Sequence, residues 1–165
     1  MKEIFYNRAK VVEYAKKWYN KRNPKYYNYD LIGGDCTNFI SQCIYEGCKT
    51  MNYLKEKGWY YINANNKSPS WTGVQFLYNF LTNNKLVGPY GSYSTQADIE
   101  VGDIAQISFD GQKFSHTVII VRITNKLSLD GIFVASHTFD SFDKKISSYN
   151  YKKIRFIHIN GARQL

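Results

Sequence analysis

Long apolar runs and an N-terminal leader pattern are both missing from this sequence. No stretch approaches the ~18 consecutive apolar residues that a membrane-spanning helix needs, so no membrane span is expected. The opening residues Met1–Arg8 contain neither an apolar core nor a small-residue cleavage site, which predicts that the chain as given carries no secretory signal. With 44% hydrophobic and 21% charged residues, the composition excludes intrinsic disorder, and the length of 165 residues predicts a single domain over 1–165.

Cysteine is scarce, since only Cys36, Cys43 and Cys48 are present. An odd number of cysteines within so short a span argues against a disulfide framework. Their spacing does not match the Cys-x-x-Cys pairs of zinc sites, and no histidine lies nearby, so we expect no metal and no other cofactor. At least one thiol is therefore predicted to be free.

Acidic residues are also few: 13 Asp and Glu stand against 22 Lys and Arg, which gives a net charge of +9. The sequence also contains 15 Tyr. Cations and aromatic rings together are typical of proteins that bind nucleic acid, and also of proteins that bind anionic polymers such as a bacterial cell wall. A Lys-rich surface without a specific partner gives the same composition. No stacking motif or basic helix stripe is present, so we expect no nucleic-acid partner. The sequence indicates no oligomeric state.

Helical periodicity precedes strand-like alternation along the chain. Apolar residues recur at helical spacing over residues 7–19, 36–46 and 73–83. Short strands are predicted over 103–109, 116–124, 131–137 and 154–159. The segment 49–71 is predicted to be a surface excursion, and 84–101 a loop. Helices followed by antiparallel strands, without βαβ alternation, predict an α+β domain whose helices pack on one face of a sheet.

Three residues are expected to mark helix ends. Asn7 and Thr72 are candidate N-caps of the first and third predicted helices. Gly47 is expected just past the end of the second, in the position that glycine favours.

The residues around Cys36 are those expected around a reactive thiol. This residue follows Gly33-Gly34-Asp35 and falls in the first turn of the second predicted helix. The free N–H groups and the positive dipole end of a helix N-terminus lower the pKa of a thiol. The same N–H groups can stabilise an oxyanion. The pattern favours Cys36 as a nucleophile, whereas Cys43 and Cys48 fit buried, inert thiols.

Histidine is the residue that would serve as base, and only three are present. His116 begins one apolar strand and His137 ends the next, so an antiparallel pair would bring both to one rim of the sheet. His116 is then the candidate base, with either His137 or Asp140 as the group that orients its ring. Strand geometry favours His137, and negative charge favours Asp140. His158 lies between two isoleucines and is expected on the alternate, partly exposed face of the last strand.

Motifs along nearly the whole chain match one known family. They are Tyr6-Asn7-Arg8, Asn23-Pro24, Gly34-Asp35-Cys36-Thr37-Asn38-Phe39-Ile40-Ser41-Gln42, Ser70-Trp71-Thr72, Gly102-Asp103-Ile104, Ser115-His116-Thr117, His137-Thr138-Phe139-Asp140 and Arg155-Phe156-Ile157-His158-Ile159. On these motifs the chain resembles the putative amidase domain of clostridial and bacillar cell-wall proteins, which is related to the NlpC/P60 and CHAP cysteine peptidases.

The resemblance implies a papain-like, NlpC/P60-like α+β fold with Cys36 as nucleophile and His116 as base. A polar residue on the strand after the histidine completes the triad in these relatives, and that position falls on or near His137. Asp35 and Thr37 flank the thiol where the relatives hold polar groups of the substrate.

Four further residues are candidate substrate-binding groups. Asn38 stands where the NlpC/P60 relatives have glycine, and its side chain is expected either to narrow the pocket or to donate to an oxyanion. Tyr29 and Trp71 are aromatic candidates for the wall of a substrate groove, as is Trp59, although tryptophan is more often packed in a core.

The function implied is a cysteine-dependent amidase or endopeptidase that cleaves amide bonds in the stem peptides of peptidoglycan or in another peptide substrate. Its place of action would be the cell wall, outside the cell. The sequence is also compatible with two other functions. One is an inactive papain-like module that binds cell wall, and the other is an acyltransferase or transglutaminase that uses the same Cys-His pair.

Overall fold

The computed structural model describes residues 1–165 and contains four α-helices and nine strands. The helices are α1 (Arg8–Trp18), α2 (Cys36–Cys48), α3 (Pro69–Thr72) and α4 (Val74–Asn83). The strands are β1 (Lys2–Ile4), β2 (Tyr61–Asn63), β3 (Asn66–Lys67), β4 (Gly88–Ser94), β5 (Ile104–Ser108), β6 (His116–Ile123), β7 (Ile132–Ser136), β8 (Ser141–Lys145) and β9 (Lys153–Gln164).

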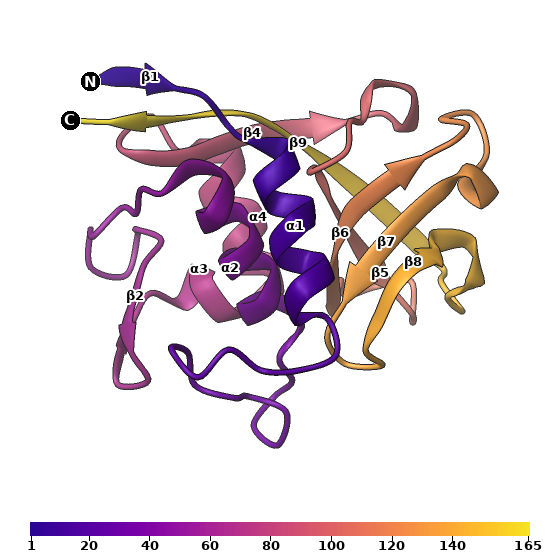
Figure 1. The fold of residues 1–165 in the computed structure, drawn as a ribbon, viewed down its shortest axis with the longest axis horizontal. Coiled ribbons are helices and arrows are strands. Elements are labelled where there is room, and N and C mark those ends of the chain that lie inside the picture. Colours follow the sequence, from indigo (N-terminus) through magenta and orange to yellow (C-terminus); the bar gives the residue numbers. More distant parts are fainter.

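Seven of the strands form one antiparallel sheet in the order β1-β9-β5-β6-β7-β8, with β4 also paired to β9. β2 and β3 form a separate hairpin. In Figure 1 the helices lie together on one side of the molecule and β5–β8 on the other, while both termini lie at one end, where β1 pairs with β9. The predicted α+β class with an antiparallel sheet is therefore confirmed.

Two apolar clusters cover the two faces of this sheet. The first joins the helices to the sheet and includes Phe39 and Ile44 of α2 together with Ile119 of β6. The second, smaller cluster includes Val118 of β6 and Tyr149. Since consecutive strand residues point to opposite faces, β6 contributes alternately to the two clusters.

The central helix, α2, is buried nearly all round, because α1, α3 and the sheet enclose it. Asn7 caps α1 as predicted, since its side-chain oxygen accepts from the N–H of Lys10 at 3.1 Å. Gly47 does not end α2, which continues to Cys48. A Cβ at Gly47 would lie 2.6 Å from the Tyr6 ring, so this glycine serves close packing against the segment that leads into α1.

Buried charge ties the start of α1 to the sheet. Asp103 is fully buried and accepts from the guanidinium of Arg8 at 2.7 Å and from the N–H of Ile159 at 2.9 Å. Nδ1 of His158 lies 2.8 Å from the same carboxylate. His158 is partly exposed as predicted, and its contacts are those of a structural residue.

Two segments predicted to be irregular prove to be structured. Residues 84–101 contain β4, which pairs with β9 although its composition of Gly, Pro, Ser and Tyr is typical of turns. Residues 49–71 are no surface excursion, because Trp59 and Trp71 are fully buried and α3 lies within the segment.

The element ends and short strands also differ from the prediction in places. Gly73, rather than Thr72, caps α4, and β9 extends to Gln164. β1 and β8 were not predicted. None of the helices is long and apolar enough to cross a membrane.

Candidate active site

The thiol of Cys36 lies at the N-terminus of α2, as predicted. Gly33 and Gly34 precede it with φ of 81° and 93°, values in the left-handed region that glycine adopts without strain. Asp35 is the N-cap, and Cys36 is the first residue of the helix. The local sequence therefore turns the chain sharply into the helix and leaves its first N–H groups beside the sulfur.

The surroundings of the sulfur are polar but closed. Sγ of Cys36 lies 3.7 Å from Oγ1 of Thr37, which in turn lies 3.0 Å from Oγ1 of Thr117 on β6. Burial raises the pKa of the Cys36 thiol, while the N–H of Thr117 and the hydroxyl and N–H of Thr37 oppose the rise. The expectation of a lowered pKa at the helix N-terminus was therefore wrong, because burial outweighs the hydrogen bonds.

His116 begins β6 and is 4% exposed. Its ring centroid lies 5.5 Å from that of Tyr149 and 6.2 Å from that of Phe109. Burial and, next, the positive charge of Lys144 lower the pKa of His116 to about 4, so its ring is neutral at physiological pH. Nε2 of this ring is buried and has no hydrogen-bond partner. A neutral imidazole with an unpartnered nitrogen is able to accept or donate a proton.

Cys36 and His116 have two neighbours in common, Thr117 and Tyr149. Thr117, which follows His116, contacts the threonine beside the thiol. Tyr149 packs against the His116 ring, and its pKa is raised mainly by burial and in smaller part by charge on Cys36. No hydrogen bond joins the sulfur to the imidazole in this structure; hydrogen bonds of this kind are often loose in ligand-free enzymes.

His137 lies elsewhere and makes different contacts. Nδ1 is 2.6 Å from a carboxylate oxygen of Asp35, Nε2 is 2.8 Å from the carbonyl oxygen of Trp18, and the ring stacks on Phe39 at 3.8 Å. Both ring nitrogens face oxygen atoms that accept hydrogen bonds. The contacts of His137 therefore hold Asp35 and the start of α2, and no hydrogen bond links it to His116.

Asp140, the alternative orienting group, is held at the surface. The guanidinium of Arg22 donates to both carboxylate oxygens of Asp140, at 2.9 and 3.1 Å, and to both of Asp30, at 2.9 and 3.0 Å. This double fork fastens the loop before α2 to the turn after β7. No hydrogen bond links Asp140 to His116.

Asp35 is the centre of the polar contacts around the α2 N-terminus. Besides His137, its carboxylate accepts from the N–H of Tyr29 and from the amide of Asn38, both at 2.9 Å. The side chain is 1% exposed. Its contacts therefore position the loop and helix that carry the thiol.

The remaining predicted substrate-binding residues, Thr37, Asn38, Tyr29 and Trp71, are all buried. Trp71 is fully buried, stacks with Tyr26 and donates from Nε1 to the amide oxygen of Asn38 at 3.0 Å. The amide group of Asn38 is thus fully engaged within the protein. The hydroxyl of Tyr29 is buried without a partner, and burial raises the pKa of Tyr29 to about 12.

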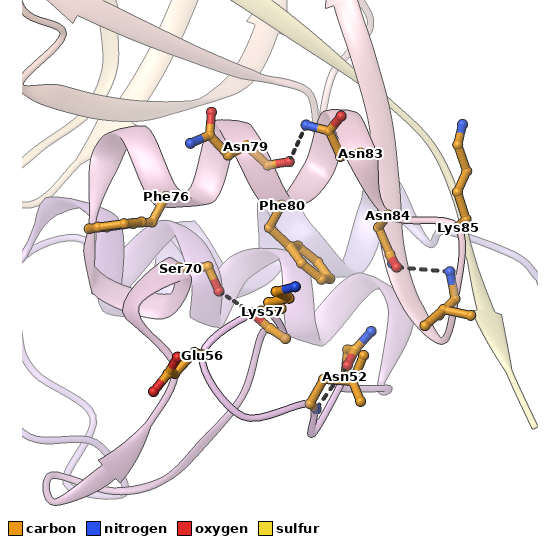
Figure 2. A pocket seen from close by; sticks show the side chains of 13 residues that line it. Asn52, Glu56, Lys57, Ser70, Phe76, Asn79, Phe80, Asn83, Asn84 and Lys85 are labelled. Carbon is orange, nitrogen blue, oxygen red and sulfur yellow. Dashed lines mark hydrogen bonds between the residues drawn. The ribbon is translucent and has the colours of Figure 1, made fainter.

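A cavity of about 500 Å³ lies away from the thiol, between α4 and the loop that carries Lys57. Figure 2 shows its lining, in which Phe80 occupies the centre and Asn79 and Asn83 lie along α4. None of the candidate residues lines it. No group of three or more His, Cys, Asp or Glu side chains is arranged to hold a metal ion.

Sequence reasoning missed several residues of the site, including Thr117, Tyr149, Lys144 and Arg22. Thr117 was visible in the Ser-His-Thr motif. Tyr149 follows an unpredicted strand and is one of 15 tyrosines, so no sequence signal distinguished it.

The fold and site define an α+β protein with a buried, free thiol at a helix N-terminus and a neutral histidine on the neighbouring strand. Residues 5–160 match the model of the family described as "Putative amidase domain", and the chain belongs to this family. The family description indicates amide hydrolysis.

The chain is also similar to the uncharacterized protein YhbB of Bacillus subtilis (strain 168), with 34% identity over 118 residues. The matched region covers 70% of this chain and 37% of that protein, so the chain spans little more than a third of its relative's length. No solved structure matches the chain.

Proposed function

We propose that this protein hydrolyses amide bonds through a Cys36 nucleophile and a His116 base, on a papain-like fold related to those of the NlpC/P60 and CHAP peptidases. The observation that carries the proposal is the unpartnered, neutral imidazole of His116 beside the helix N-terminus that bears the thiol. The order of the elements, with the thiol on a helix and the histidine on a following strand, supports the fold relationship.

The first half of the reaction forms an acyl-enzyme. His116 takes the thiol proton as the sulfur of Cys36 attacks the amide carbonyl carbon, and the N–H groups at the start of α2 stabilise the oxyanion. The imidazolium then gives this proton to the amide nitrogen. The C–N bond breaks, and the amine leaves.

The second half releases the acid. His116 removes a proton from water, the hydroxide attacks the thioester carbon, and the C–S bond breaks as the sulfur regains the proton. The resting thiol is protonated because its pKa is raised, so proton transfer to the base accompanies attack and does not precede it.

The proposed substrate is the stem peptide of peptidoglycan, acted on at the cell wall outside the cell. The net charge of +9 suits a polymer rich in carboxylates, and the family's description as an amidase domain supports an amide substrate. Mass spectrometry of purified peptidoglycan treated with the protein is the test. New amino and carboxyl ends at one bond type are expected, and an intact polymer with cleavage of other peptides would contradict this substrate.

Adding an amine to the reaction distinguishes hydrolysis from acyl transfer, because the two reactions give different products. Water is the expected acceptor, so the free acid should remain the main product at millimolar amine. A dominant amide product would instead identify an acyltransferase that uses the same pair.

The pH profile gives a prediction specific to His116. The base must be neutral to accept the thiol proton, and its pKa is about 4. We therefore expect kcat/KM to stay level as the pH falls through 6.5 and to decline only near pH 4. An acid limb near pH 6.5, measured while circular dichroism shows the chain folded, would contradict the buried, neutral base.

A further inference from the structure

The imidazole of His116 is held by aromatic packing. Tyr149 lies 5.5 Å from it between ring centroids, at an interplanar angle of 52°, and Phe109 lies 6.2 Å away. Neither His137 nor Asp140 reaches the ring, because both are engaged by other partners. A base with no hydrogen-bonded orienting group depends on its packing partners for orientation.

Tyr149 is itself fixed at both ends. Its hydroxyl lies 2.9 Å from Oγ of Ser136, the last residue of β7, and that oxygen lies 3.3 Å from Oγ of Ser141, the first residue of β8. The ammonium of Lys144 lies 3.9 Å from the centroid of the Tyr149 ring, a cation–π contact. The side chain is 7% exposed. Strands that follow His116 in the chain thus hold the ring against which it packs.

The phenol of Tyr149 is also electrostatically coupled to the thiol. Burial raises the pKa of Tyr149, the hydroxyls of Ser136 and Ser141 oppose this, and charge on Cys36 raises it further. The hydroxyl therefore stays protonated when the sulfur becomes negative.

We propose that Tyr149 is the positioning residue of this site, with its ring setting the plane of the His116 imidazole and its hydroxyl anchoring that ring through Ser136. The inference rests on the proposed function, and it deepens that function by assigning the role that His137 and Asp140 do not fill by contact. Lys144 completes the arrangement, because it lies over the same ring and its charge disfavours protonation of the base.

Substitutions at Tyr149 separate the ring from the hydroxyl. Tyr149→Phe keeps the ring but removes the hydrogen bond that anchors it to Ser136, so kcat should fall roughly 10- to 100-fold with KM within about 3-fold. Tyr149→Leu removes the ring as well, and kcat should fall further. Tyr151→Phe is the matched control and should have wild-type kinetics, because Tyr151 is 37% exposed and makes no side-chain hydrogen bond. Wild-type kcat in Tyr149→Phe would overturn the role of the hydroxyl.

The second readout needs no substrate. The groups that face His116 with charge or a titratable proton are Lys144 and Tyr149, and Tyr149 is in turn influenced by Cys36. Lys144→Gln should raise the pKa of His116 in an NMR titration, and Tyr149→Leu should raise it by admitting water. Lys145→Gln, at the exposed neighbouring position, should leave it unchanged. An unchanged His116 titration in both Lys144→Gln and Tyr149→Leu would overturn the packing role.

These outcomes separate the inference from the function on which it rests. If Cys36→Ala keeps full activity, the proposed function fails, and the NMR titration still decides whether Tyr149 holds His116. If Cys36→Ala is inactive while Tyr149→Phe matches the wild type in kcat and pH profile, the positioning role of its hydroxyl alone fails.

Discussion

Replacement of Cys36 by alanine should reduce amide hydrolysis at least about 10⁴-fold in kcat/KM, the size of effect that loss of a nucleophile has in other hydrolases. The reason is chemical, because without the sulfur no acyl-enzyme forms and His116 has no thiol proton to take. Folding should be little affected, since the change removes one sulfur at the end of a helix. Activity is to be measured on the amide bond found by mass spectrometry, with circular dichroism to confirm the fold.

Cys48→Ala is the matched control for this experiment. Cys48 is also a buried thiol of α2, at its opposite end, and burial raises the pKa of Cys48 to about 12. Its removal should leave kcat/KM within about 3-fold of the wild type. Cys43 is a poorer control, because it is fully buried in the first apolar cluster and its loss would create a cavity. Equal activity in Cys36→Ala and Cys48→Ala would contradict the nucleophile.

The positions of Cys36 and His116 in the fold could be predicted, because the residues around each of them indicate the start of a helix or a strand. Glycines before an apolar helical pattern placed Cys36 at a helix start, and an apolar run placed His116 at a strand start. Strands without such a pattern were missed. β4 is rich in Gly, Pro and Ser, which favour turns, and it forms a strand because β9 offers it a long pairing partner, a contact about 70 residues away that no local pattern encodes.

The residue that packs against His116 was harder to predict, because it depends on which face of the sheet each side chain points to. An antiparallel pair does bring His116 and His137 to one rim, as expected. However, His137 stacks on Phe39 of the helical cluster, whereas His116 packs on Tyr149 of the second cluster. The two imidazoles therefore pack against different apolar clusters, and no hydrogen bond links them. Only the register between β6 and β7 decides this, and no local pattern in the sequence encodes that register.

Asp35→Asn should cause a large loss of stability. The buried carboxylate receives hydrogen bonds from Tyr29, Asn38 and His137, and the guanidinium of Arg22 lies 3.8 Å away. An asparagine amide cannot accept on both sides, and it removes the negative charge that faces Nδ1 of His137 and the guanidinium of Arg22. Breaking a buried pair in this way costs about 3–5 kcal/mol, which for a chain of this size lowers Tm by roughly 10 °C.

Asp30→Asn is the matched control, because Asp30 binds the same Arg22 at the surface. Exposed ion pairs contribute at most about 1 kcal/mol, so Tm should fall by no more than a few degrees. Thermal unfolding by circular dichroism measures both variants. A similar, small change in Asp35→Asn would show that the carboxylate does not hold the start of α2.

The partner substitution His137→Gln decides what the second histidine does. If its contacts with Asp35 and Trp18 define its role, His137→Gln lowers Tm and couples with Asp35→Asn in a double-mutant cycle, because both changes break one interaction. The His116 titration should then stay as in the wild type, and kcat should fall far less than in His116→Gln. A loss of kcat as large as that of His116→Gln, at unchanged Tm, would instead make His137 the group that orients the base.

The same measurements of kcat and Tm on Asp140→Asn test the other candidate for orienting the base. Asp140 pairs with Arg22 at the surface, so we expect this variant to keep wild-type kcat.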